Sequence, residues 1–323
     1  MDNITKLFIY SDEITRNDIL ITPNIDFMKS LNYKCLTIKQ CPNISQYLID
    51  NNIEKLGHCI LHVIDYSFKY IMSNREIIKS QNYVFIYYGD IHPSVKKERT
   101  LRRIESLELI MNSPNTFIYC SVSYLIGKYY PFFPQNKIIH NIYNSINDNF
   151  ILEEKVNMNP SNTILLSGSV GMYYPARKRM LNLMNNNDMI VRLKSNDPTI
   201  IEKKYMYNLR EHLCCFACSL THEIPYIVFK VFEIPASGSL LLMCDYTVKE
   251  HMLKLGFIDG QNYISCTMKN MNDKIKYILD PINRDEIDRI RINGYNFVLK
   301  YHKMSDRMKL LDNIITSIVN HQL

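Results

Sequence analysis

The segment IPYIVFKVFEIPASGSLLLMCDY occupies residues 224–246. Its apolar positions predict a helix over 226–236, then a turn of small residues and a buried strand over 239–244. Such a passage is typical of an open α/β sheet, in which ligands bind at the carboxyl edge of the parallel strands. We expect Glu233 at that edge, where its carboxylate can accept hydrogen bonds from the paired hydroxyls of a ribose. Lys230, one helical turn earlier, can face the adjoining phosphates.

The same alternation of short β-rich runs and amphipathic segments extends along the whole chain and predicts parallel strands joined by crossover helices. In the first half the predicted strands are 6–10, 34–38, 59–64, 83–88, 116–120 and 138–143, and the predicted helices are 24–31, 44–51, 67–80, 96–111 and 121–129. In the second half the strands are 163–167, 189–194, 214–217, 239–244 and 263–265, and the helices are 175–185, 199–212, 226–236, 248–255, 271–279, 285–302 and 305–320. The polar stretch 144–162 is predicted to be an interdomain linker.

Composition indicates an ordinary folded protein. The chain has 323 residues, enough for two domains, with 46% hydrophobic and 22% charged residues. Lys and Arg total 38 against 32 for Asp and Glu, and the resulting charge of +6 is scattered along the chain. No nucleic-acid partner is therefore indicated. Only nine glycines occur, so each carries more structural information than usual.

The N-terminal residues lack the pattern of a secretory signal, and no apolar run is long enough to span a bilayer. The nine cysteines lie mostly within apolar runs and lack the spacing of a disulfide framework. We therefore expect reduced core thiols, a cytoplasmic protein and at most peripheral membrane contact. For a chain encoded by a large DNA virus, this location would be the host cytoplasm or the virion.

A second segment, ILLSGSVGMYYPARKRML at residues 164–181, passes from a strand through a small-residue loop into a basic helix. Backbone amides around Gly168 and Ser169, with the helix start behind them, can form an anion site, and Arg177 and Lys178 follow within reach. The glycine spacing does not match the dinucleotide-binding fingerprint. An ordinary strand-to-helix turn remains the alternative interpretation.

Four motifs in a fixed order resemble a known family. They are the loop and helix at 164–181, FKVFEIPASGSLLL at 229–242, LGFIDGQNYI at 255–264 and GYNFVLKYHKMSDRMKLL at 294–311. Together they are similar to the C-terminal half of the GT-B glycosyltransferases of the group-1, family-4-like type, especially the spore-coat-maturation-like branch. In that comparison Asp259 and Gly260 occupy the family's turn before a strand, and His302 with Arg307 matches its His-x4-Arg signature.

The resemblance implies an α/β fold of GT-B type, with two Rossmann-like domains whose parallel sheets face each other across a cleft. The N-terminal domain, on the acceptor side, would span 1–155. The nucleotide-sugar-binding domain would span 156–303. A C-terminal helix at 304–323 would pack back on the first domain.

The resemblance further implies a glycosyltransferase that takes a nucleoside-diphosphate sugar, UDP- or GDP-linked, without a cofactor or metal. The acceptor would be a glycan, a protein or a lipid. Glu233 would hold the nucleotide ribose, while backbone at Ala236, Ser237 and Gly238 would approach the ligand. The remaining donor-site candidates are the groups that could stabilise the departing phosphate: Gly168, Ser169, Arg177, Lys178 and Lys230.

One departure from the family pattern leaves an alternative open. Retaining members carry a first glutamate eight residues before the second, but position 225 here is Pro225, and Glu223 lies two residues away. Retention is favoured by the resemblance, and an inactive GT-B-like binding or scaffold protein is the alternative. An epimerase or phosphorylase of the same fold is a further one.

In the first half, the run YVFIYYGDIHPS at residues 83–94 leaves an apolar strand at a glycine. Asp90 and His92 follow on the predicted loop and could act as base and orienter for an acceptor hydroxyl, or position it. A plain surface turn is the alternative. His58, Cys59 and His62 have metal-ligand residue types, but Cys59 and His62 would face opposite sides of a strand, so we expect a core role instead.

Overall fold

The computed structural model describes residues 5–11, 23–62, 67–89, 91, 97–154, 156–171, 174–194, 202–221 and 224–321. The chain divides into two compact units, which are described separately. Unit 1 runs to Tyr143 and resumes at Ser305, whereas unit 2 spans Asn144–Met304. The chain thus enters unit 2 earlier than the expected boundary after residue 155.

Unit 1 is built on one parallel sheet with strand order β2-β1-β3-β4-β5-β6. Its strands are β1 (Thr5–Tyr10), β2 (Tyr33–Thr37), β3 (Leu56–His62), β4 (Val84–Tyr87), β5 (Thr116–Tyr119) and β6 (Ile138–Ile139). Its helices are α2 (Ile25–Ser30), α3 (Ile44–Asp50), α4 (Ser67–Ser73), α5 (Arg75–Lys79), α6 (Lys97–Met111), α7 (Ile126–Tyr129) and α14 (Met304–His321). Strands β4 and β5 are buried at every position, as expected for a parallel sheet covered on both faces.

Asn74 explains why one predicted helix, over 67–80, is observed as the two helices α4 and α5. The Asn74 side chain is buried, accepts a hydrogen bond from the Ile44 backbone at 2.7 Å and donates to the Tyr70 carbonyl at 2.9 Å. An asparagine side chain that bonds to nearby backbone competes with helical hydrogen bonding. Asn74 therefore interrupts the helix and also fixes the start of α3.

Unit 2 is built on a second parallel sheet with strand order β11-β10-β9-β7-β8. Its strands are β7 (Ser161–Ser167), β8 (Ile190–Leu193), β9 (His212–Cys218), β10 (Leu240–Cys244) and β11 (Ile264–Cys266). Its helices are α8 (Pro175–Met184), α9 (Glu202–Arg210), α10 (Lys230–Ala236), α11 (Lys249–Lys254), α12 (Met271–Leu279) and α13 (Arg284–Tyr301). Pro175 at the first turn of α8 suits its position, because no backbone N–H is needed there.

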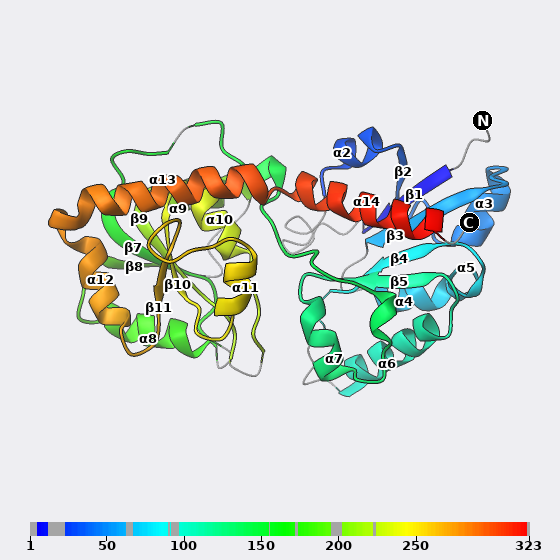
Figure 1. The fold of residues 1–323 in the computed structure, drawn as a ribbon, viewed down its shortest axis with the longest axis horizontal. Coiled ribbons are helices and arrows are strands. Elements are labelled where there is room, and N and C mark those ends of the chain that lie inside the picture. The colour runs from blue at the N-terminus through cyan, green and yellow to red at the C-terminus, as the bar shows by residue number, and fades with distance from the viewer. Residues whose placement is uncertain are drawn as a thin grey trace. The chain divides into compact units, whose positions relative to one another are not determined.

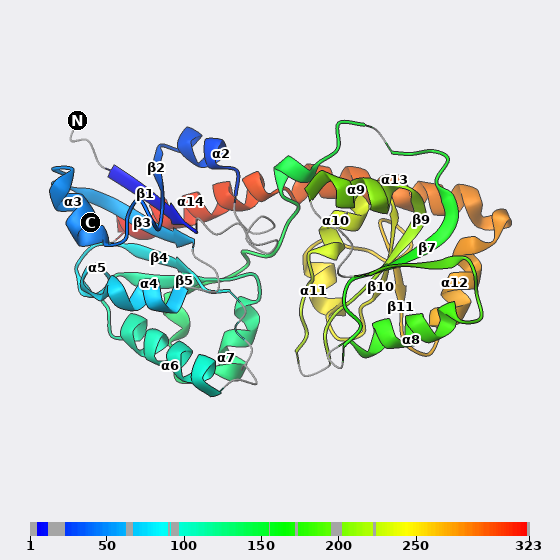
Figure 2. The ribbon, with the colours of Figure 1, turned by 180° about the vertical axis from the view of Figure 1, so that it is seen from behind.

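The strand order of unit 2 reverses direction between β7 and β9. The chain moves outward from β7 to β8, then returns to add β9, β10 and β11 on the other side. Right-handed crossovers then place α8 on one face of the sheet and α9 and α10 on the opposite face, as Figures 1 and 2 show. In open α/β sheets the ligand crevice lies at such a reversal, beside the carboxyl ends of the two central strands.

The polar stretch 144–162 differs from the predicted linker, because much of it packs into unit 2. The backbone N–H of Ile146 donates to the His302 carbonyl at 3.0 Å, and Phe150 and Leu152 are buried. The Asn144 side chain donates to the Ile227 carbonyl at 2.9 Å. Polar side chains are frequent in the stretch 144–162 because some of them bond to backbone, and not because the stretch is a solvent-exposed linker.

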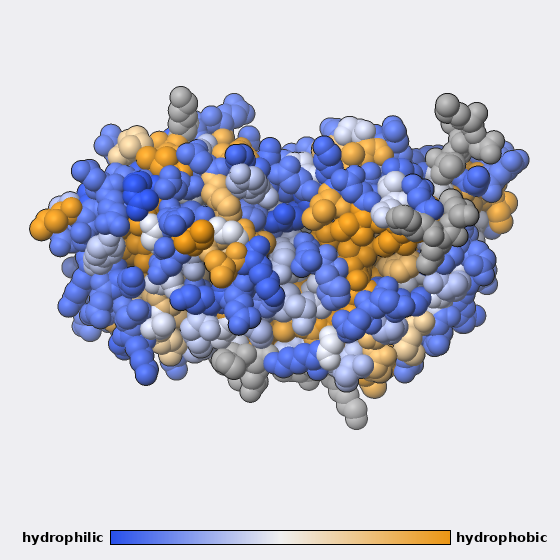
Figure 3. Space-filling view, viewed as in Figure 1, coloured by the Kyte–Doolittle hydropathy of each residue, from blue (hydrophilic) through white to orange (hydrophobic). Residues whose placement is uncertain are grey.

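The surface and the cysteines agree with a folded α/β protein. Hydrophilic side chains cover most of the face shown in Figure 3. All nine cysteines are free thiols, and only Cys35 is not buried. Among the described residues, no helix combines the length and the apolar character that crossing a bilayer requires.

Candidate functional site

In unit 2 the reversal of strand order lies between β7 and β9, so the expected ligand crevice is where these two strands end. Ser167 closes β7 and Cys218 closes β9, and the two strands are neighbours in the sheet. Gly168 follows Ser167 directly with a backbone φ of +94°, a conformation that glycine adopts without strain. The chain therefore turns sharply at the edge where open parallel sheets bind ligands.

Two buried cationic side chains converge on Gly168. A methyl group added at Gly168 would lie 3.1 Å from Nη1 of Arg177 and 3.4 Å from Cε of Lys230. The exposed fractions of Arg177 and Lys230 are 4% and 8%. Two of the donor-site candidates, from α8 and α10, thus meet a third at the end of β7.

Arg177 carries a charge that has no counterion among the described residues. Its Nη1 donates to the Ser169 carbonyl at 3.0 Å, and its guanidinium carbon lies 3.8 Å from the centre of the Tyr174 ring. Its Nε is buried without a hydrogen-bond partner, and no ion pair in the described part of the chain involves Arg177. A buried cation without a paired acid is costly, so this position favours an anionic ligand.

The nearby Cys218 thiol does not supply that charge. Burial raises the pKa of Cys218 to about 11, and the Arg177 guanidinium lowers it only in part. The thiol is therefore neutral at physiological pH. Lys178, the next residue along α8, is exposed and lies outside the buried pair.

Tyr205 of α9 orients the second cation. Lys230 Nζ donates to the Tyr205 hydroxyl and lies 4.7 Å from the centre of the Tyr205 ring. The same hydroxyl lies 2.9 Å from Oγ of Ser167. This buried series joins β7, α9 and α10 at the crevice, and nothing in the sequence distinguished Tyr205 from other helical tyrosines.

Glu233 lies in the first turn of α10 and is 3% exposed. It is three residues after Lys230, so both side chains project from neighbouring positions of the helix. A buried carboxylate requires hydrogen-bond donors. The helix thus carries a cation and an acid close to the edge at which the crevice opens.

Ala236, Ser237 and Gly238 lie elsewhere, at the amino edge of the sheet. Ser239, the next residue, donates from Oγ to the carbonyl of His212, the first residue of β9, at 2.8 Å. A methyl group at Gly238 would lie 3.2 Å from Cα of Val156. The close approach at this glycine is to the chain itself, so the structure does not bring these residues to Gly168.

A second polar group at the carboxyl edge was missed by the sequence reasoning. Asp245 follows β10 and is buried, accepting hydrogen bonds from the Tyr263 hydroxyl at 2.6 Å and the Ser265 hydroxyl at 2.7 Å. Both carboxylate oxygens are therefore used within unit 2. The residue links β10 to β11 and stiffens the edge beside the crevice.

In unit 1, Asp90 and His92 lie outside the described residues, so their predicted role stays a prediction. The described residue between them, Ile91, is buried. On the neighbouring strands, Nδ1 of His140 lies 3.2 Å from Oγ of Ser123. This pair occupies the carboxyl side of β5 and β6.

The two histidines of β3 serve the core, as expected from the strand pattern. His58 Nε2 lies 2.7 Å from the Tyr33 hydroxyl, and His62 Nδ1 lies 2.8 Å from the Tyr119 hydroxyl. Both rings are buried. Within the described ranges, no group of three His, Cys, Asp or Glu side chains is arranged to hold a metal ion.

Comparison with known proteins identifies the fold. No family model matches the chain, and no curated protein sequence matches it. Among solved structures, Anabaena Alr3699/HepE in complex with UDP-glucose is similar with a TM-score of 0.60 and 9% identity, over 97% of this chain and 99% of that one. A glycosyltransferase from Rickettsia africae ESF-5 is similar with a TM-score of 0.55 and 11% identity, over 98% and 99% of the two chains.

TarM is similar with a TM-score of 0.55 and 10% identity, covering 83% of this chain. This chain spans 57% of the TarM chain. The likeness to these structures agrees with the two parallel sheets observed here and with the resemblance seen in the sequence motifs. The chain therefore has the GT-B fold, with two Rossmann-like units.

Proposed function

We propose that this protein is a glycosyltransferase that uses a nucleoside-diphosphate sugar and binds the diphosphate at the carboxyl edge of β7 in unit 2. The observation that supports this most is Arg177, a buried guanidinium that no acid in the described part of the chain pairs with, beside Gly168 and Lys230. A diphosphate supplies the negative charge that this position lacks, and guanidinium and ammonium groups bind phosphate oxygens well.

The same groups suit the chemistry of glycosyl transfer. As the bond between the sugar carbon and the β-phosphate oxygen breaks, negative charge accumulates on the departing phosphate. That charge would be stabilised without a metal by Arg177, Lys230 and the backbone at Gly168 and Ser169. Cations that are already fixed in a buried position need no rearrangement as the charge develops. Glu233 would accept hydrogen bonds from the ribose hydroxyls.

The structures with a similar fold suggest which nucleotide to test first as the donor. HepE was solved with UDP-glucose, with UDP, and with UDP and glucose. We propose UDP as the first nucleotide to test and GDP as the second. The acceptor, a glycan, protein or lipid, would bind to unit 1, and Asp90 and His92 would activate or position its hydroxyl. The reaction would take place in the cytoplasm.

Calorimetric titration with UDP, GDP, ADP, CMP and dTDP, with magnesium and with EDTA, tests the donor site. We expect one nucleotide to bind with an affinity that EDTA leaves unchanged. Glu233→Ala should weaken its binding about tenfold to a hundredfold, since hydrogen bonds to charged groups contribute about 1.5–3 kcal/mol. Arg177→Met should weaken binding at least as much, whereas Lys178→Met, its exposed neighbour, should not.

Failure of all five nucleotides to bind the folded protein would contradict the donor site. If Arg177→Met and Lys178→Met had equal affinities, the site would lie elsewhere in the chain. Loss of binding in EDTA would contradict metal independence alone.

An inactive binding or scaffold protein is the alternative, and Pro225, where retaining relatives carry a glutamate, supports it. Slow hydrolysis of the bound sugar nucleotide separates the two, because an active transferase site releases free sugar even without an acceptor. Binding without hydrolysis, for every sugar carried by the bound nucleotide, would favour the scaffold. The anomer of the released sugar would report whether the reaction retains or inverts configuration.

A further inference from the structure

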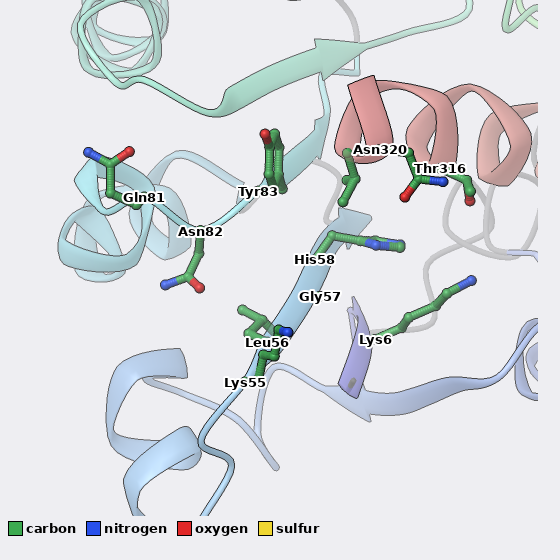
Figure 4. A pocket seen from close by; sticks show the side chains of 11 residues that line it. Lys6, Lys55, Leu56, Gly57, His58, Gln81, Asn82, Tyr83, Thr316 and Asn320 are labelled. Atoms are coloured by element: carbon green, nitrogen blue, oxygen red, sulfur yellow. The ribbon is translucent and has the colours of Figure 1, made fainter. Parts of the chain in front are cut away.

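A pocket of about 420 Å³ lies at the amino edge of the unit 1 sheet. It is lined by the first residues of β1 and β3, by the segment before β4, and by the last turns of α14 (Figure 4). Its volume falls within the range of small-molecule sites, about 300–1,000 Å³. The pocket is therefore at the opposite end of the strands from the carboxyl edge, where open parallel sheets bind ligands.

His58 is one of several polar residues that line the pocket, together with Gln81, Asn82, Thr316 and Asn320. Its side chain is 4% exposed and lines the pocket between Lys6 of β1 and Tyr83, which precedes β4 (Figure 4). Nε2 of His58 lies 2.7 Å from the Tyr33 hydroxyl, which donates to Oδ1 of Asp312 at 2.6 Å. The His58 ring is therefore fixed by a series of hydrogen bonds that runs through Tyr33 to Asp312.

That series determines which ring nitrogen carries the proton. A carboxylate only accepts hydrogen bonds, so the single Tyr33 proton goes to Asp312. Nε2 of His58 must then donate to the Tyr33 oxygen. Burial, and next the charge of Lys6, lowers the pKa of His58 to about 4, so the ring is neutral and Nδ1 has a free lone pair. None of the residues that the structure describes donates to Nδ1.

The charges around the pocket restrict what can use this acceptor. Lys6 and Lys55 both line it, and none of the described residues that line it carries a carboxylate, which disfavours a cationic ligand. Nζ of Lys6 is already paired with Asp312 at 3.2 Å. The lone pair of Nδ1 would repel an anion placed against it. The remaining class is an uncharged molecule that donates a hydrogen bond.

The lining sets the rest of the ligand. Leu56 and Val319 contribute aliphatic groups to the lining, and Tyr83 contributes a ring. We propose that this pocket binds a small, uncharged, mostly apolar molecule that carries one hydroxyl group, and that the hydroxyl donates to Nδ1 of His58. The apolar body would pack between β3 and α14.

Matched probes test the hydroxyl. Calorimetric titration of the full chain with para-butylphenol and with para-butylanisole compares two molecules of similar shape, of which only the phenol can donate. We expect the phenol to bind about tenfold more tightly, because an unpaired buried acceptor costs at least about 1 kcal/mol. Equal affinities, no binding of either, or tighter binding of para-butylbenzoate would each overturn the proposal.

Variants test the location. Val319→Trp should fill the pocket from α14 and abolish phenol binding, whereas Ser317→Trp, at an exposed position that does not line it, should leave binding unchanged. His58→Phe keeps a ring but removes the acceptor, so its phenol affinity should fall to that of the anisole. Retention of phenol binding in Val319→Trp would overturn the proposal, even if His58→Phe failed to fold.

Discussion

Gly168 combines two demands that only glycine meets in this structure. Its φ of +94° strains any other residue, and a methyl group would press on Arg177 at 3.1 Å. We predict that Gly168→Ala lowers the free energy of unfolding of unit 2 by about 1–2 kcal/mol. It should also weaken nucleotide binding several-fold, because the guanidinium and Lys230 must shift. Urea unfolding and calorimetry measure the two effects.

Gly260 separates the two effects. It has a φ of +74°, but a methyl group there would meet nothing within 4 Å. Gly260→Ala should therefore reduce stability to a similar extent and leave nucleotide affinity unchanged. Equal losses of affinity in the two variants would show that the effect at Gly168 is a general loss of folding and not a displacement of the cations.

Tyr205 gives a second prediction for a single residue, because its hydroxyl accepts from Lys230 and lies 2.9 Å from Oγ of Ser167. Tyr205→Phe removes that link and keeps the ring. We predict an affinity for the nucleotide about threefold to tenfold lower, as a hydrogen bond contributes about 0.5–1.5 kcal/mol.

Tyr207 is the matched control for Tyr205. It lies on the same helix α9, is 39% exposed and donates to Oε1 of Glu154 at 2.7 Å. Tyr207→Phe should not change nucleotide affinity. Calorimetry that gave the same affinity for Tyr205→Phe as for the unmodified chain would remove Tyr205 from the proposed site.

Among the elements, α14 is tied to the unit 1 sheet through Asp312, Tyr33 and His58, and this connection responds to pH. Burial lowers the folded-state pKa of His58 to about 4, below an unfolded value of about 6.5. Between these values the unfolded chain binds more protons, so stability falls as pH falls. At about pH 5 the loss from His58 alone is about 2 kcal/mol relative to about pH 7.

His58→Phe provides the comparison. The variant lacks the titrating group, so its stability should change less between the two pH values, by about 2 kcal/mol. Urea unfolding of both proteins at each pH measures the difference. Equal pH dependence in the two proteins would mean that the pKa of His58 is the same in the folded and unfolded states, which would contradict the lowering of this pKa by burial.

Helix α13 is anchored by Arg291, whose side chain is fully buried. Nε of Arg291 donates to Asp288 at 3.1 Å, and Nη1 donates to the Asn157 carbonyl at 2.8 Å. Arg291→Leu removes one of the two cations paired with Asp288, the other being Arg284, and leaves the Asn157 carbonyl without its donor. We therefore predict a loss of about 3 kcal/mol. Arg289→Leu, on the exposed side of the same helix, should cost less than about 1 kcal/mol by urea unfolding.

The helices and strands were largely predictable, because the spacing of apolar residues along a short stretch of sequence distinguishes a helix from a strand. Helix α12, Met271–Leu279, was predicted with the bounds observed. Differences arise where one side chain reaches a distant backbone. Asn74 interrupts a predicted helix by bonding to Ile44, and such a partner thirty residues away leaves no local signal.

The candidate site was predictable only in part, for the same reason. Gly168, Arg177 and Lys230 lie in motifs that suggested phosphate contact, and the structure brings them together. Tyr205, which orients Lys230, was not predicted, because helix α9 contains no recognisable motif. Gly238 was expected near the ligand because the family resemblance implied it, and its neighbour in space is Val156.

At the scale of the whole molecule, the division into two units separates the two proposed ligands. The nucleotide would contact residues of unit 2, and the hydroxyl-bearing molecule would contact residues of unit 1. A ligand stabilises the segments it contacts, by about 2.7 kcal/mol at a hundredfold excess over its Kd, and local stability is read from hydrogen exchange.

Hydrogen exchange measured by mass spectrometry on the full chain should therefore give two distinct patterns. The nucleotide should slow exchange in peptides that contain Gly168 and Lys230, and para-butylphenol should slow it in peptides that contain His58 and Val319. Because Arg177→Met would remove a proposed phosphate contact but no part of the pocket, it should weaken the first pattern and preserve the second. If both ligands protected the same peptides, they would share one site, and the assignment of separate sites to the two units would be wrong.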